Sequence, residues 1–173
     1  MKRLVIVSLA LATAAALWAA PSVRRGALAS FENAFATKLE NSGMEILALP
    51  RGVYLEGYGA VFSTDVMLTF TPTINPFRLS IDKEVIAAVY HKKLTQMQVL
   101  RAKMQEILVD SGSALNTVPT QEQVVLVVTL GNEKWETTGS LPSQIYMQAQ
   151  RAKLIQAKLG KVKPETIVKV QEL

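Results

Sequence analysis

The chain has 173 residues, of which 49% are apolar, and its 19 Lys and Arg residues outnumber its 14 Asp and Glu residues. This length predicts one domain, or two at most, with enough buried surface to fold without a disulfide or a metal. Because cysteine is absent, disulfide frameworks, thiol nucleophiles and cysteine-ligated zinc or iron–sulfur centres are excluded. The apolar content excludes global disorder.

The N-terminus has the pattern of a secretory signal peptide. Lys2 and Arg3 precede an uncharged, mostly apolar run over residues 4–20, which is the order of segments that an export signal requires. Small residues allow cleavage after Ala19 or after Ala29. The sequence therefore predicts signal peptide and short leader over residues 1–29, a single domain over 30–173, and a periplasmic or secreted location.

An uncleaved membrane anchor is the alternative. As a helix, the run would span about 25 Å at 1.5 Å per residue, slightly less than a bilayer core of about 30 Å. Arg24 and Arg25 follow the run and oppose the rule that places cationic residues on the cytoplasmic side. The cleaved signal is preferred, and a membrane-anchored accessory subunit remains the alternative.

The first half of the domain is predicted to hold a short helix and then strands. Ser30 is a candidate N-cap for a helix that stops at the Asn41-Ser42-Gly43 turn. Strands are predicted over residues 44–49, 53–58 and 60–71. The last of these alternates apolar and polar residues, as a half-buried strand does. On its apolar face are Phe62, Val66, Leu68 and Phe70, and on its polar face Ser63, Asp65 and Thr69.

A long amphipathic helix is predicted to follow, from Asp82 to about Val109. Apolar residues recur in it every three or four positions and would form one stripe. The turn-forming residues 110–113 are predicted to end the helix. The members of the stripe are Ile86, Tyr90, Leu94, Met97, Leu100, Met104 and Leu108.

The C-terminal third is predicted to contain strands and a short helix. The uninterrupted apolar run 124–130 is typical of a strand buried on both faces. Gly131-Asn132 predicts a two-residue hairpin into a strand over 133–138, and alternation over 145–149 predicts another strand. A helix is then expected over 151–159 with Gly160 as its C-cap, before a last strand within 166–173.

These elements predict an α+β fold. Strands joined by tight turns favour a mainly antiparallel sheet of about five to six strands, with the long helix packed across one face and shorter helices at the ends. The same order of elements occurs in small domains with a roadblock- or profilin-like layout. That analogy concerns element order and carries no function.

His91 is the single histidine of the chain, and it precedes Lys92 and Lys93 on the predicted long helix. A catalytic histidine needs an orienting acid and a nucleophile, and the neighbouring sequence supplies neither. A histidine on a helix surface is therefore the favoured interpretation. One histidine without cysteine also makes a transition-metal site improbable, and the scattered carboxylates do not resemble a calcium or magnesium site.

Glu56, Tyr58 and Asp65 are the other weak catalytic candidates, since a hairpin through Gly57-Tyr58-Gly59 would bring the two acids close together. A hydrolase-like enzyme using these carboxylates is one alternative function. The two glycines do not complete a dinucleotide fingerprint, because the third glycine and the following helix are missing. The favoured interpretation is a tight turn with positive φ beside two solvent-facing acids, and no cofactor is predicted.

Charge is distributed unevenly along the domain. Residues 30–91 hold four Lys or Arg against seven Asp or Glu, whereas residues 92–173 hold eleven against seven. Five basic residues between Glu136 and Glu165 form a candidate patch for an anionic membrane surface or an acidic partner. Nucleic acid is a poor fit, because the chain is predicted to be exported and the basic segment lacks interleaved aromatic residues. The competing interpretation is a solvated helix whose late lysines suit its C-terminal dipole. The five residues are Arg151, Lys153, Lys158, Lys161 and Lys163.

The stretch 49–62, continuing to Asp65-Val66, contains Tyr54-x-x-Gly57-Tyr58-Gly59-x-x-Phe62. It resembles a segment of uncharacterised exported bacterial proteins that begin with a signal peptide. The resemblance implies bacterial origin and export and brings no catalytic residue. Taken together, the sequence predicts a non-enzymatic binding or assembly module that contacts an envelope protein or a second copy of itself.

Overall fold

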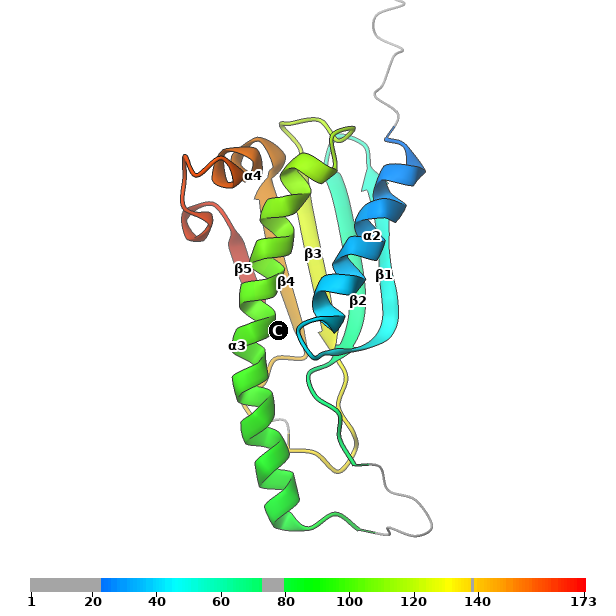
Figure 1. Cartoon of the computed structure of the whole chain (residues 1–173), viewed down its shortest axis with the longest axis vertical. Coiled ribbons are helices and arrows are strands. Elements are labelled where there is room, and N and C mark those ends of the chain that lie inside the picture. The colour runs from blue at the N-terminus through cyan, green and yellow to red at the C-terminus, as the bar shows by residue number, and fades with distance from the viewer. Residues whose placement is uncertain (1–22, 73–79, 138) are drawn as a thin grey trace, which may run out of the picture.

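The computed structural model describes residues 23–72, 80–137 and 139–173 (Figure 1). Predictions that concern residues 1–22, including cleavage after Ala19, lie outside this part, as do the proline-containing segment 73–79 and Thr138. The described elements are α2 (Arg25–Glu40), β1 (Glu45–Leu55), β2 (Gly59–Met67), α3 (Lys83–Ala114), β3 (Gln123–Leu130), β4 (Gln144–Gln150), α4 (Arg151–Lys158), the 3-10 turn η1 (Pro164–Thr166) and β5 (Lys169–Glu172).

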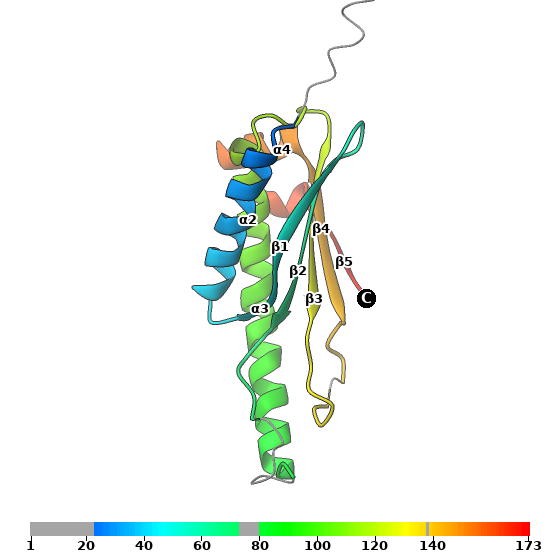
Figure 2. The same ribbon diagram turned by 90° about the vertical axis from the view of Figure 1, so that its right-hand side faces the viewer.

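The fold is α+β, as the sequence predicts, and its strands form one five-stranded sheet in the order β1-β2-β3-β4-β5. β2 and β3 are parallel because the long helix α3 connects them, and the other three pairs are antiparallel. α2 and α3 lie side by side on one face of the sheet, and the opposite face carries no helix of the described residues (Figure 2).

The core lies between the sheet and these two helices. On α2, Phe31 packs edge-on against Phe62 of β2, with ring centroids 4.6 Å apart. The predicted stripe of α3 is buried in its C-terminal half, at residues such as Met97 and Leu108. Ile86, Tyr90 and Leu94 are half-buried, because the N-terminal half of α3 extends beyond the sheet (Figure 1).

α2 begins at Arg25, five residues before the predicted cap at Ser30. Leu28 is a buried core residue, and Arg25 forms an ion pair of 2.7 Å with the buried Glu32. The same two side chains bind the backbone of Gly52 on β1. Arg25 donates a hydrogen bond to the carbonyl of Gly52, and the amide of Gly52 donates one to Glu32. The folded domain thus includes residues that the sequence assigns to the leader.

The predicted strands 44–49 and 53–58 are one strand, β1. Pro50 and Gly52 look like a break in the sequence, but β1 is at the edge of the sheet, where proline is tolerated. Two register shifts, on either side of Ala48, absorb the extra residues. The prediction of two separate strands is therefore wrong.

α3 does not end at residues 110–113, as its turn-forming residues predict, but continues to Ala114. Gly112 lies against α4, so close that an added Cβ would be 2.8 Å from Cβ of Leu154. Ser111 is buried and donates a hydrogen bond to the carbonyl of Leu108. Here a glycine serves close helix packing and does not end the helix.

The predicted hairpin at Gly131-Asn132 is also wrong: residues 131–143 form a long connection from β3 to β4, and residues 133–137 are not a strand. The connection packs against α3 instead, because Lys93 of α3 donates hydrogen bonds to Asn132 and Glu136. The remaining C-terminal predictions are confirmed. α4 ends at Lys158, Gly160 has a φ of 71°, and the tail forms the strand β5.

Candidate functional site

The structure does not bring the catalytic candidates of the sequence together. Glu56 and Tyr58 lie in the β1–β2 turn, whereas Asp65 lies near the far end of β2, opposite Ala48. Gly59 and Asp65 are separated by six residues of one strand, or roughly 20 Å at about 3.3 Å per residue. His91 belongs to α3, where it is exposed beside the ring of Tyr90.

The hairpin through Gly57-Tyr58-Gly59 exists and has a structural explanation. Gly57 and Gly59 have φ values of 78° and 135°, which favour glycine. At Gly59 an added Cβ would be 1.9 Å from the carbonyl oxygen of Gln123, so only glycine lets β2 and β3 approach here. The turn is therefore required by the sheet itself.

Glu122 supports this turn and was missed by sequence reasoning. Its buried carboxylate accepts hydrogen bonds from the hydroxyl of Tyr54 at 3.1 Å and from the amide of Gly57 at 3.2 Å. Burial, together with the neighbouring Glu122, raises the pKa of Tyr54. Because Glu122 is more than sixty residues from the turn in sequence, no local pattern could have identified it.

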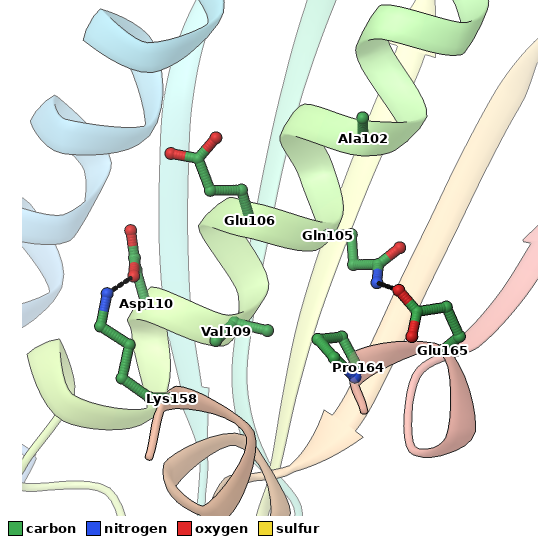
Figure 3. Close-up of a pocket in the computed structure, with 8 residues that line it drawn as sticks. All are labelled: Ala102, Gln105, Glu106, Val109, Asp110, Lys158, Pro164 and Glu165. Carbon is green, nitrogen blue, oxygen red and sulfur yellow. Dashed lines mark hydrogen bonds and ion pairs between the residues drawn. The ribbon is translucent and has the colours of Figure 1, made fainter. Parts of the chain in front are cut away.

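A cleft of about 410 Å³ lies between α3, α4 and η1 (Figure 3). One lining residue, Lys158, belongs to the predicted basic patch, and its side chain points to Asp110. Glu165, which follows the patch in the sequence, accepts a hydrogen bond of 2.9 Å from Gln105. The lining residues are Ala102, Gln105, Glu106, Val109, Asp110, Lys158, Pro164 and Glu165.

The carboxyl groups of this cleft are poor proton donors at neutral pH. Burial raises the pKa of Asp110, but hydrogen bonds from Lys158 and Lys38 outweigh it and leave the pKa lowered. Bonds from Lys103 and Lys38 lower the pKa of Glu106. General acid catalysis needs the opposite, a carboxyl group whose pKa is raised towards neutrality. The cleft thus holds neutralised ion pairs.

Glu165 behaves in the same way. Its own backbone amide and the side chain of Gln105 lower its pKa, so the third carboxylate of the cleft is also charged at neutral pH. Across the described residues, no group of three or more His, Cys, Asp or Glu side chains is placed to hold a metal ion. Within that part of the chain, the arrangement supports electrostatic contact between helices.

The predicted basic patch is smaller than the sequence suggests. Arg151 is buried and donates hydrogen bonds to the carbonyls of Gly112 and Val118, so it ties α4 to the end of α3. Lys158 is paired with Asp110. The exposed residues of the patch that form no ion pair among the described residues are Lys153, Lys161 and Lys163.

The open face of the sheet, opposite α2 and α3, is divided into two halves. Cross-strand pairing places Val53, Val61, Val125, Gln148 and Lys169 in one row and Arg51, Ser63, Val127, Tyr146 and Gln171 in the next. The β1–β3 half of these rows is mostly valine, and the β4–β5 half consists of two glutamines, a lysine and a tyrosine.

The apolar half of the open face is partly exposed. Val53 and Leu55 on β1 are 51% and 47% exposed, whereas Val125 and Val127 on β3 are buried. Beside them, Tyr146, Gln148, Lys169 and Gln171 line a shallow depression of about 420 Å³. This face offers an apolar surface with a polar border.

Among the helices of the described residues, none is both long and apolar enough to cross a bilayer. Comparison with family models, with curated proteins and with solved structures finds no match for this chain.

Proposed function

We propose that this protein is an exported, non-enzymatic assembly module that associates with a second copy of itself through the open face of its sheet. The observation that carries the proposal is β3, which places Val125 and Val127 on the open face and Leu126 and Val128 on the core face. A strand covered on one face normally alternates apolar and polar residues, and a continuous apolar strand is typical of a sheet covered on both.

Exposed apolar side chains on β1, which β2 separates from β3, support the same surface. Val53 and Leu55 continue the apolar half of the open face onto the edge strand β1. Contiguous exposed apolar patches with a polar border are typical of protein–protein contacts. The lowered pKa values of the cleft carboxyls support a binding role over acid–base catalysis.

Charge favours a second copy as the partner. The N-terminal half of the domain, which supplies β1 and β2, carries an excess of acids, and the C-terminal half, which supplies β3, β4 and β5, carries an excess of bases. Two copies can therefore bring the acidic half of one domain towards the basic half of the other. Such electrostatic complementarity selects partners and orientation.

Light scattering of the purified exported chain over a range of concentrations tests this proposal. We expect a concentration-dependent dimer or larger assembly, and we expect the double variant Val53→Glu/Leu55→Glu to be monomeric. The matched control is Leu159→Ser, which alters a more exposed leucine directly after α4 and should leave assembly unchanged. A wild-type chain that is monomeric throughout, or an assembly unaffected by the double variant, would contradict the proposal.

Export is tested by the mass of the protein recovered from outside the cytoplasm. Cleavage after Ala19 leaves α2 intact, whereas cleavage after Ala29 would remove Leu28 from the core and the Arg25 partner of Glu32. We therefore expect the exported form to retain Arg25. A full-length mass would support the anchored alternative, and protein confined to the cytoplasm would refute export.

A further inference from the structure

The tip of α4 combines an exposed leucine with exposed lysines. Leu159 directly follows α4 and is 64% exposed. Gly160, with its φ of 71°, turns the chain there. Lys161 and Lys163 follow it in the sequence. Both lysines are exposed and form no ion pair in the described part of the chain. An exposed apolar residue with unpaired cationic residues close to it in the chain is the composition that binds at the surface of an anionic bilayer.

This tip lies at the end of the molecule where the described chain begins. In both ribbon views, α4 and the first turn of α2 are at the same end of the long axis, and the start of α3 is at the other (Figures 1 and 2). Arg24, at the start of α2, is exposed and adds to the positive charge. The described chain therefore begins at the same end as α4.

We propose that this end of the domain, which we call the basic tip, docks on an anionic lipid bilayer, with Leu159 entering the headgroup region. The basic tip consists of Leu159, Lys161 and Lys163. It is separate from the open face of the sheet, so the inference stands or falls independently of self-association. An acidic protein is the competing partner for the lysines, but it gives no reason for a leucine exposed among them.

Single-site labelling tests the basic tip directly, because the chain has no cysteine of its own. The variant Leu159→Cys carries an environment-sensitive NBD label, and Leu49→Cys is the matched control. Leu49 is 62% exposed and lies midway along β1. Each labelled full-length chain is mixed with vesicles of equal parts phosphatidylglycerol and phosphatidylcholine, and separately with vesicles of phosphatidylcholine alone.

We expect a blue shift and increased emission at position 159 with anionic vesicles, weaker with neutral vesicles and reduced by high salt. Position 49 should not respond. Lys161→Gln with Lys163→Gln in the labelled chain should weaken vesicle binding about 25-fold, at roughly fivefold for each lysine.

A second pair of neutralised lysines controls for net charge. Lys83→Gln with Lys92→Gln alters two exposed lysines of α3 towards the opposite end of the molecule and should leave the signal at 159 nearly unchanged. No shift at 159, equal shifts at 159 and 49, or equal losses from the two lysine pairs would overturn the proposal. So would a stronger response at 159 to polyglutamate than to vesicles, which would assign the tip to an acidic protein.

Discussion

Two of the groups of ion pairs that hold α3 to the rest of the molecule differ in burial. Lys93 and Glu136 join α3 to the β3–β4 connection, with side chains that are 1% and 2% exposed. Asp110, near the other end of the helix, binds Lys38 of α2 and Lys158 of α4, and all three side chains are between 29% and 52% exposed. The first group is a dry contact and the second is in contact with water.

Breaking a lysine–carboxylate ion pair should therefore cost more free energy at Lys93 and Glu136 than at Asp110 and Lys158. A buried charge that loses its partner has no solvent to replace it, whereas an exposed one is rehydrated and screened. Lys93 also donates to Asn132 at 2.9 Å, while Oε1 of Glu136 has no hydrogen-bond partner within the described residues. The buried group should therefore fix the β3–β4 connection, and the exposed group should add little to stability.

The largest effect is expected from breaking the buried pair. Lys93→Met leaves the Glu136 carboxylate buried without its cation and should lower the free energy of unfolding by about 3–5 kcal/mol. The double variant Lys93→Met/Glu136→Leu should recover most of this loss, because it leaves no uncompensated charge. Urea unfolding of the two variants measures both effects. A loss below about 1 kcal/mol in the single variant would show that the pair is solvated.

A smaller effect is expected from packing beside the exposed group. Gly112→Ala places a Cβ 2.8 Å from Cβ of Leu154 and should lower the free energy of unfolding by about 1–3 kcal/mol, through overpacking between α3 and α4. Gly26→Ala in α2 is the control, since nothing lies within 4 Å of its added Cβ, and it should stabilise the helix by about 0.5–1 kcal/mol. Equal effects in thermal unfolding would argue against close helix contact at Gly112.

The exposed pair itself should contribute less still. A double-mutant cycle with Asp110→Asn and Lys158→Gln should give a coupling free energy of about 0–1 kcal/mol. This value, measured by urea unfolding, is to be compared with the loss at Lys93. A coupling above about 2 kcal/mol would mean that the network around Asp110 excludes water as the buried pair does.

The smallest effect is expected from acid titration of the exposed group. The pKa values of Asp110 and Glu106 are lowered from their ordinary values of 3.8 and 4.5. Their contribution is thus complete above about pH 4.5 and is lost as the pH falls through the lowered values. Asp110→Asn with Glu106→Gln should flatten the acid limb of the stability curve by less than about 1 kcal/mol. An unchanged acid limb would show that these carboxylates are not stabilised in the fold.

Local patterns in the sequence were sufficient where an element depends on its own residues. Alternation in β4, the apolar run of β3 and Gly160 after α4 each predicted the observed element, because side-chain periodicity and backbone freedom are local properties. The same reasoning failed at Gly112 and at Gly131-Asn132. Gly112 packs against Leu154 of α4, and Asn132 accepts a hydrogen bond from Lys93 of α3. These contacts are made with residues distant in the sequence, so a local pattern does not predict them.

The candidate site could be predicted less well. The sequence predicts Arg151 as part of a surface patch, but its side chain is buried and donates hydrogen bonds to the carbonyls of Gly112 and Val118. Lys93, two residues after His91, appeared in the sequence only as a cationic neighbour of that histidine, and it is 1% exposed. Sequence gives the charge of a residue but not its exposure, which depends on segments that approach from elsewhere in the chain.

By itself, the sequence determined the α+β class, the mainly antiparallel sheet, the long helix and the absence of thiol chemistry, because these follow from periodicity and composition. Tertiary structure decided which face of the sheet stays open, which lysines reach the surface and that Glu56 and Asp65 lie apart. The physical reason is that secondary structure arises from neighbours within a few residues, whereas burial and charge pairing arise between residues such as Lys93 and Glu136, which only folding brings into contact.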